Sequence, residues 1–146
     1  MNWNNKDREH IWHPFTPLLG VDDPLVVTKA EGVYLHTDDG RKIIDAVSSW
    51  WVNLHGHSHP EITQAIEQQA SILEHVIFAG FTHKPAIQLA ENLLSVLPKN
   101  QKKIFYSDNG STSVEVALKM AFQYWYNQGE EKNKVIAIDG AYHGDT

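Results

Sequence analysis

Cysteine is absent from this chain of 146 residues, and so are apolar runs long enough to cross a membrane. Without cysteine, neither disulfides nor thiolate metal sites can form. Positive charge is also scarce, because 12 Lys and Arg stand against 18 Asp and Glu, for a formal net charge of -6. A chain without a basic stripe is poorly suited to nucleic acid as its main partner.

The N-terminal segment MNWNNKDR is polar, so the sequence predicts neither a signal peptide nor a membrane span. A cytoplasmic location is the resulting expectation. Hydrophobic residues make up 42% of the chain, with five each of Trp, Tyr and Phe. This composition predicts a globular chain about one domain long that could bury a sizeable core.

Residues 104–125 combine a short apolar run, a polar loop and a helical pattern. Residues 104–106 suit a buried strand, and the loop at residues 107–111, SDNGS, tolerates tight turns. Thr112 and Glu115 have capping-box spacing, and the helical face that follows is Val114, Ala117, Leu118, Ala121, Phe122 and Trp125. The start of such a helix directs unpaired N–H groups at one point, which favours an anion such as phosphate. The alternative is a helix cap without a ligand.

A second apolar run, residues 135–138, leads into a loop that contains Tyr142, His143 and Gly144. In a strand-helix-strand unit the strands are parallel, so both loops leave from the C-terminal strand ends, where ligands of open α/β sheets collect. The two loops are therefore predicted to share a cleft that suits a flat, phosphorylated cofactor. Because two parallel strands cannot cover themselves, the chain is expected to be the front part of a longer protein.

The residues before this unit predict an arm, a small sheet and two helices. Prolines in the run HPFTPL, residues 13–18, favour an extended aromatic arm over a helix up to about Val21. Three short runs at residues 25–28, 33–36 and 42–45 are typical of an antiparallel meander, with an Asp-Gly turn signal between the last two. Pro60 and Pro85 each suit the first turn of a helix, and Pro98 ends the second one.

Two clusters between the meander and the first of these helices allow more than one interpretation. Trp50 and Trp51 present large rigid surfaces, of which one could line a pocket, although core or interface packing is the alternative. His55, His57 and His59 alternate as metal ligands on a strand would, but Gly56 and Ser58 indicate a turn. Structural or helix-capping histidines are favoured, and no metal site is predicted.

Several runs, spread in order over the chain, resemble the class III aminotransferases that depend on pyridoxal 5'-phosphate (PLP) and have fold type I. The runs are Gly32-Val33-Tyr34-Leu35, Asp39-Gly40-Arg41, Ile44-Asp45, Gly56-His57-Ser58-His59-Pro60, Gly110-Ser111 with Glu115 and Ala117, and Tyr142-His143-Gly144-Asp145-Thr146. The resemblance implies an α/β fold. Residues 1–58 would be the arm and small-domain meander, and residues 59–146 the start of the large parallel-sheet domain.

The resemblance also implies roles for individual residues. Gly110 and Ser111 would bind the cofactor phosphate, Tyr142 would stack on the pyridine ring and border the substrate, and Trp50 would line the substrate pocket. Phe15 stands where such enzymes commonly carry tyrosine after the His-Pro of the arm. The ring is kept there and the hydroxyl is lost.

No catalytic residue is assigned within this chain. The family resemblance places the lysine that holds the cofactor aldehyde as a Schiff base, and the acid near the pyridine nitrogen, well downstream of the Tyr142 loop. Lys119 is a poor substitute, because its spacing from Glu115 predicts a solvent-exposed salt bridge on the helix face opposite the apolar stripe. The chain alone is therefore expected not to transaminate.

Within the family, the runs at residues 11–14, 48–51 and 121–125 resemble members that transfer the amino group of S-adenosylmethionine to 8-amino-7-oxononanoate. That reaction gives 7,8-diaminononanoate in biotin biosynthesis, and such enzymes are homodimers. Other class III enzymes, acting on an ω-amino acid or a diamine, are an alternative. A noncatalytic phosphate-binding α/β module and, more remotely, a metal hydrolase built on the three histidines are the others.

Overall fold

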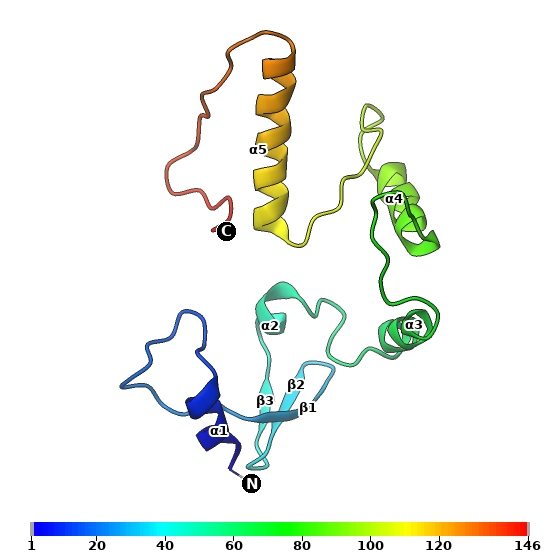
Figure 1. The fold of residues 1–146 in the computed structure, drawn as a ribbon. Helices are drawn as coiled ribbons and strands as arrows, with labels where there is room; N and C mark the ends of the chain where they lie inside the picture. The colour runs from blue at the N-terminus through cyan, green and yellow to red at the C-terminus, as the bar shows by residue number, and fades with distance from the viewer. Residues whose placement is uncertain (1, 146) are drawn as a thin grey trace. The chain divides into compact units, whose positions relative to one another are not determined.

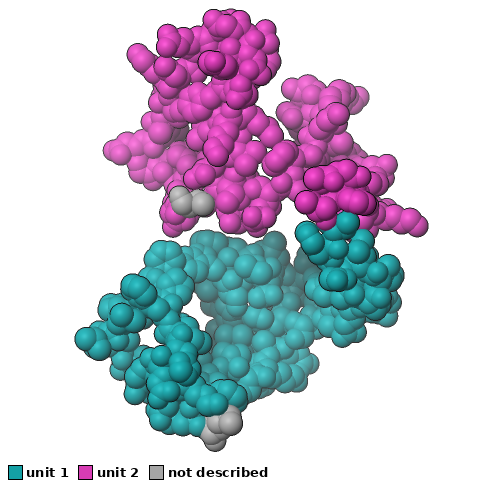
Figure 2. Space-filling view, in the orientation of Figure 1, with its two compact units in different colours: residues 1–76 teal, residues 77–146 magenta. Residues whose placement is uncertain are grey.

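A computed structural model describes residues 2–145. They fall into two compact units, residues 1–76, called unit 1, and residues 77–146, called unit 2 (Figures 1 and 2). Thr146, the last residue of the motif at residues 142–146, lies outside the described residues.

The meander of unit 1 is a three-stranded antiparallel sheet in the order β1-β2-β3 (Figure 1). Its strands are β1 (Val27–Glu31), β2 (Tyr34–Thr37) and β3 (Lys42–Ile44). The predicted meander is confirmed, with β1 starting two residues later than expected. Gly40 adopts the positive φ of +84° that the tight turn between β2 and β3 requires.

The loop after the two tryptophans closes onto this sheet as an extra rung. The His57 amide donates to the Gly32 carbonyl at 2.7 Å, and the Gly32 amide donates to the His57 carbonyl at 3.0 Å. Gly56 makes the approach possible, because a Cβ atom there would lie 3.1 Å from the Gly32 backbone. The Ser58 hydroxyl then donates to the Ala30 carbonyl at 2.8 Å.

Unit 1 also contains three helices. Helix α3 (Pro60–Ala70) begins at the predicted proline. Helix α1 (Trp3–His10) contradicts the prediction of an extended arm in its first part. It forms because Asn2 caps it and the first proline comes only at position 14. The short turn α2 (Ser48–Trp51) has positive φ at all four residues.

The helices of unit 2 are α4 (Lys84–Val96) and α5 (Gly110–Asn127). Pro85 lies in the first turn of α4 as predicted, and Pro98 follows Leu97, the C-cap of the helix. The predicted start of α5 was wrong, because Asn109 and not Thr112 is the N-cap; Thr112 is the third residue of the helix.

The two predicted parallel strands are not formed. Residues 104–106 and 135–138 have the sequence pattern of strands, but they belong to no sheet. The meander is the one sheet of residues 2–145. A strand exists only when a neighbour accepts and donates its backbone hydrogen bonds, and neither run has such a neighbour here. The α/β class with a small antiparallel sheet is confirmed without the parallel ladder.

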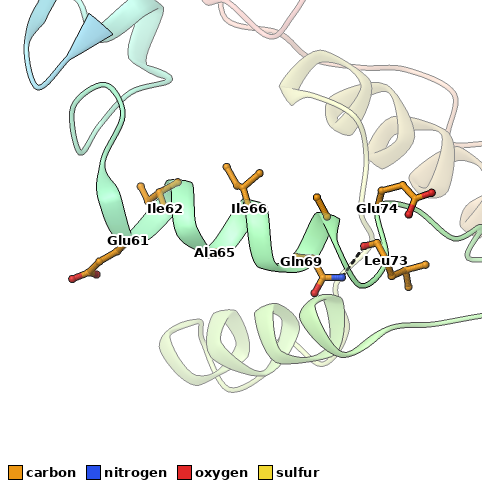
Figure 3. Close-up of a pocket in the computed structure, with 8 residues that line it drawn as sticks. Glu61, Ile62, Ala65, Ile66, Gln69, Leu73 and Glu74 are labelled. Carbon is orange, nitrogen blue, oxygen red and sulfur yellow. Dashed lines mark hydrogen bonds between the residues drawn. The ribbon is translucent and has the colours of Figure 1, made fainter.

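The expected hydrophobic core was also wrong. Among residues 2–145 no hydrophobic residue is buried, and Thr37, 5% exposed, is the one polar residue that is buried as a whole, backbone included. Figure 3 shows one consequence, an open groove lined by Ile62 and Ile66 of α3 and by Leu73 in the segment after the helix. Ile66 is 64% exposed there.

Among residues 2–145, no helix is both long enough and apolar enough to cross a bilayer.

Candidate functional site

A cleft of unit 2 lies at the N-terminus of α5. It has a volume of about 740 Å³ and is lined by Asn109, Gly110, Ser111, Val114, Tyr142, His143, Gly144 and Asp145. Two segments that are distant in the sequence therefore meet at one place. The two loops share a cleft, as the sequence predicted, even though the strands from which the prediction was drawn are not formed.

The first wall of this cleft is the capped start of α5. The Asn109 side chain accepts from the Thr112 amide at 2.9 Å, and the Thr112 hydroxyl accepts from the Asn109 amide at 3.1 Å. The hydrogen bonds of residues 2–145 leave the amides of Gly110 and Ser111 unused. Two free N–H groups at the positive end of an 18-residue helix form a binding point for an anion.

The second wall is held to the first by a close backbone approach. The Asp145 amide donates to the Ser111 hydroxyl at 3.3 Å. Gly144 has φ of +116°, and a Cβ atom there would lie 2.7 Å from both the Cα and the Oγ of Ser111. Glycine is therefore required at position 144, both by the backbone conformation and by the space available.

Tyr142 supplies the aromatic surface of the cleft. Its hydroxyl donates to Asp145 Oδ1 at 2.9 Å, while the side chain remains 76% exposed. This hydrogen bond is the main reason why the pKa of Tyr142 is raised above its ordinary value, and burial and the charge of Asp145 add to it. The phenol is therefore neutral and fixed at one end, with its ring available to a planar group.

A separate aromatic cluster lies in unit 1. The Phe15 and Trp50 rings have centroids 5.6 Å apart, and Trp50 and Trp51 meet edge to face at 6.4 Å. All three side chains are largely exposed. The structure thus brings together Phe15 and Trp50 in one unit, and Gly110, Ser111 and Tyr142 in the other.

The histidines act individually. His57 Nε2 lies 2.8 Å from Asp45 Oδ2, and both side chains are almost fully buried. His55 and His59 contact each other edge to face at 6.1 Å. His59 precedes α3, but its side chain makes no capping hydrogen bond, so the helix-capping role is wrong for it. No group of three His, Asp or Glu residues within positions 2–145 is arranged to hold a metal ion.

One sequence-based contact is not formed. The ion pairs of residues 2–145 do not include one between Glu115 and Lys119, whose side chains remain in solvent. An exposed pair at this spacing gains little over hydration, so its absence costs little.

Sequence reasoning missed three polar residues that organise the two clusters. They are Asn109, which caps α5, Asp145, which holds Tyr142, and Asp45, which accepts from His57 and Ser49. A signal was available for Asn109, because asparagine is among the residues preferred at the N-cap of a helix. The other two stand in runs that carry the family resemblance, but nothing in the sequence pattern identifies the side chains they bind.

Comparison with known proteins supplies the context for this geometry. A model of the family described as aminotransferase class-III matches residues 20–146. The adenosylmethionine-8-amino-7-oxononanoate aminotransferase of Synechococcus elongatus is 57% identical over 137 residues, which cover 94% of this chain and 32% of that protein. The enzyme of the same name from Staphylococcus aureus is 43% identical over 148 residues, covering 97% and 32%.

Solved structures give the same relation. The crystal structure of adenosylmethionine-8-amino-7-oxononanoate aminotransferase from Methanocaldococcus jannaschii is 41% identical with a TM-score of 0.91, covering 99% of this chain and 34% of that one. The omega transaminase of Pseudomonas jessenii in complex with PMP is 29% identical with a TM-score of 0.80, covering 88% and 29%. The chain spans about a third of the length of the relatives it matches.

Proposed function

Because the chain belongs to the class-III aminotransferase family, we propose that it forms part of an enzyme that transfers the amino group of S-adenosylmethionine to 8-amino-7-oxononanoate. The product would be 7,8-diaminononanoate, an intermediate of biotin biosynthesis. The proposal is supported by the shared name of the relatives that match nearly all of this chain. These relatives are about three times as long as this chain, so the complete activity is inferred from the similarity to them.

The cleft at the start of α5 is proposed to hold pyridoxal phosphate. The phosphate would accept from the free amides of Gly110 and Ser111 and from the Ser111 hydroxyl, and the Tyr142 ring would lie against the pyridine ring. The fit is supported by the size of the cleft, its N–H donors and the exposed ring of Tyr142. When bound, pyridoxal phosphate supplies the electron sink and carries the amino group between the two substrates.

The aromatic residues are proposed to contact the amino substrates. Trp50 and Phe15 would present one apolar surface, and Tyr142 would border the substrate in its own cleft. Phenylalanine at position 15 offers ring area without a hydroxyl, so any hydrogen bond to the substrate must come from elsewhere. Two further groups are proposed to lie in the part of the complete protein that corresponds to the unmatched two thirds of the relatives. They are the lysine that holds the cofactor and the acid that faces its ring nitrogen.

The organisation of the complete protein is part of the same proposal. Residues 1–58 would be the arm and small-domain meander, and residues 59–146 the start of the large domain, because Pro60 opens α3 directly after the rung that closes the meander. A cytoplasmic homodimer is proposed, and the exposed arm aromatics Trp12 and Phe15 would suit a subunit contact.

A second candidate is an aminotransferase for ω-amino acids or diamines. It is favoured by the similarity to the Pseudomonas jessenii omega transaminase over 88% of this chain. The two functions share the cofactor cleft and differ in the donor, so donor kinetics distinguish them.

The test uses the complete product of the gene that encodes this chain. Gly144→Ala should weaken binding of pyridoxal phosphate by at least roughly tenfold, because a side-chain carbon there displaces Ser111 from the cleft. Gly140→Ala is the control, since Gly140 also has a positive φ, +72°, but has open space around the new carbon. Cofactor binding is followed by absorbance titration.

Amino transfer is then assayed with 8-amino-7-oxononanoate as acceptor. Activity with S-adenosylmethionine supports the first function, and activity only with an ω-amino acid or a diamine supports the second. If the wild-type product binds no pyridoxal phosphate, or Gly144→Ala and Gly140→Ala bind it equally well, the proposed cofactor site is wrong.

A further inference from the structure

The turn that carries Trp50 has an unusual backbone. Ser48, Ser49, Trp50 and Trp51 have φ of 50°, 46°, 61° and 68°, so four consecutive residues other than glycine are left-handed. This conformation is unfavourable for residues with a side chain and is rarely adopted by more than one residue in succession. Neighbouring groups must therefore hold the turn in place.

The carboxylate of Asp45 is the side-chain group that binds the turn. Its Oδ2 atom accepts from the Ser49 hydroxyl at 2.7 Å. The hydrogen bonds from the Ser49 backbone and hydroxyl, followed by the one from His57, lower the pKa of Asp45 to about 2. The group is thus an ionised acceptor at neutral pH, and a hydrogen bond to an ionised acceptor is stronger than one between neutral groups.

Asp45 is itself fixed from the other side. His57 Nε2 lies 2.8 Å from the same Oδ2 atom, and the two side chains are only 6% and 13% exposed for Asp45 and His57. The His57 backbone is bonded to Gly32 in both directions, and the Asp45 amide donates to the Val33 carbonyl at 2.9 Å. A continuous series of contacts therefore runs from the meander through His57 and Asp45 to Ser49.

Trp50 follows Ser49 directly, and its ring packs on Phe15. A shift of the turn would therefore move both aromatic rings proposed to contact the substrate. We propose that Asp45 is a positioning residue that holds the left-handed turn through Ser49, and that it thereby sets the substrate-facing orientation of Trp50. This inference rests on the proposed function for the substrate role of Trp50, while the conformational link stands on the contacts of unit 1.

The conformational link is tested in the complete gene product labelled with 5-fluorotryptophan. The Trp50 resonance in the fluorine NMR spectrum is assigned with Trp50→Phe, and Trp125 in unit 2 serves as the internal reference. Ser49→Ala should shift and broaden the Trp50 resonance. Ser48→Ala should leave it in place, because it makes the same change in the same backbone conformation and removes no hydrogen bond to Asp45.

A second pair of variants tests the carboxylate itself. Asp45→Asn should reproduce the effect of Ser49→Ala. Asp39→Asn is its control, since Asp39 also accepts hydrogen bonds within unit 1, but from Thr37 and Arg41 in the turn between β2 and β3. If Asp45→Asn fails to fold, Ser49→Ala still decides, because it leaves the buried pair of Asp45 and His57 intact.

Kinetics test the positioning role. Ser49→Ala should raise the KM of the amino substrate that contacts Trp50 by roughly tenfold with a smaller change in kcat, because ground-state contacts are displaced. Ser49→Asn should restore much of this loss, since asparagine tolerates the left-handed conformation and offers a side-chain donor. A general loss of stability would lower activity without this division between KM and kcat and without rescue.

An unchanged Trp50 resonance in both Ser49→Ala and Asp45→Asn would overturn the inference. So would a displaced resonance accompanied by wild-type kinetic constants for both substrates. A wild-type protein without aminotransferase activity would refute the proposed function instead, and the Trp50 resonance would then decide whether Asp45 holds the turn.

Discussion

At the scale of single residues, the contact between Tyr142 and Asp145 has a measurable effect on ionisation. Loss of the phenol proton would place an anion beside the Asp145 carboxylate and remove the 2.9 Å hydrogen bond. The pKa of Tyr142 is therefore raised above the ordinary value of a tyrosine in the folded protein. This contact stabilises the folded protein. Its contribution is fully present below the pKa that Tyr142 has in the unfolded chain, and it is lost as the pH rises through the pKa of Tyr142 in the folded protein.

Asp145→Asn should lower the pKa of Tyr142 toward its ordinary value, because both the accepting carboxylate and its charge are removed. The measurement is an ultraviolet absorbance titration of tyrosine ionisation, with Tyr142→Phe used to identify the signal. Asp139→Asn, in the same loop, is the control and should leave the titration unchanged. An equal pKa in wild type and Asp145→Asn would show that this contact does not persist in solution.

The sequence predicted the residues that line the cleft better than the polar residues that fix the position of functional side chains. Ser111 and Tyr142 were placed at one cleft from the order of loops along the chain, and the structure places both there. Asp45 and Asp145 were not identified as partners. Their hydrogen bonds depend on backbone turns at positive φ, which periodicity and composition do not reveal.

At the scale of elements, the start of α5 determines where the free amides of the cleft point. Asn109 satisfies the Thr112 amide, and the reciprocal bond from Thr112 fixes the first turn. Asn109→Ala should destabilise this helix by about 1 kcal/mol, and Asn109→Gly by only a few tenths, because glycine is tolerated as a cap.

Hydrogen exchange of the Thr112 and Ser113 amides, which both donate to Asn109, measures this effect locally. Exchange should be faster in Asn109→Ala and close to wild type for amides near Asn127, at the far end of the helix. Faster exchange along the whole of α5 would instead indicate that the substitution acts on the packing of unit 2 and not on the cap.

The helices with proline in their first turn were predicted correctly, since proline both fixes φ and lacks the amide that a first turn leaves unpaired. The meander was predicted from its turn signals for a similar, local reason. The strands at residues 104–106 and 135–138 failed because a strand is a property of a pair, and a single segment specifies only half of it. The left-handed turn at residues 48–51 has no propensity signature at all.

At the scale of the whole molecule, family membership was the most accessible feature of the sequence. The motifs that carry it are spread from Gly32 to the Tyr142 loop, and the family model matches residues 20–146. The expected core was not accessible in this way. Composition gives the amount of apolar area but not whether the chain can fold back to cover it.

The groove on α3 and the exposed apolar faces of α4 and α5 favour self-association of the isolated 146-residue chain. Apolar stripes of this extent gain roughly 25 cal/mol for each Å² removed from water, so two copies lower their free energy by covering each other. Sedimentation should show reversible self-association that increases with concentration. Ile66→Gln should weaken this association. Gln64→Asn is the control and should not, because Gln64 does not line the groove. A strictly monomeric chain at high concentration would mean that these faces find cover within a single molecule.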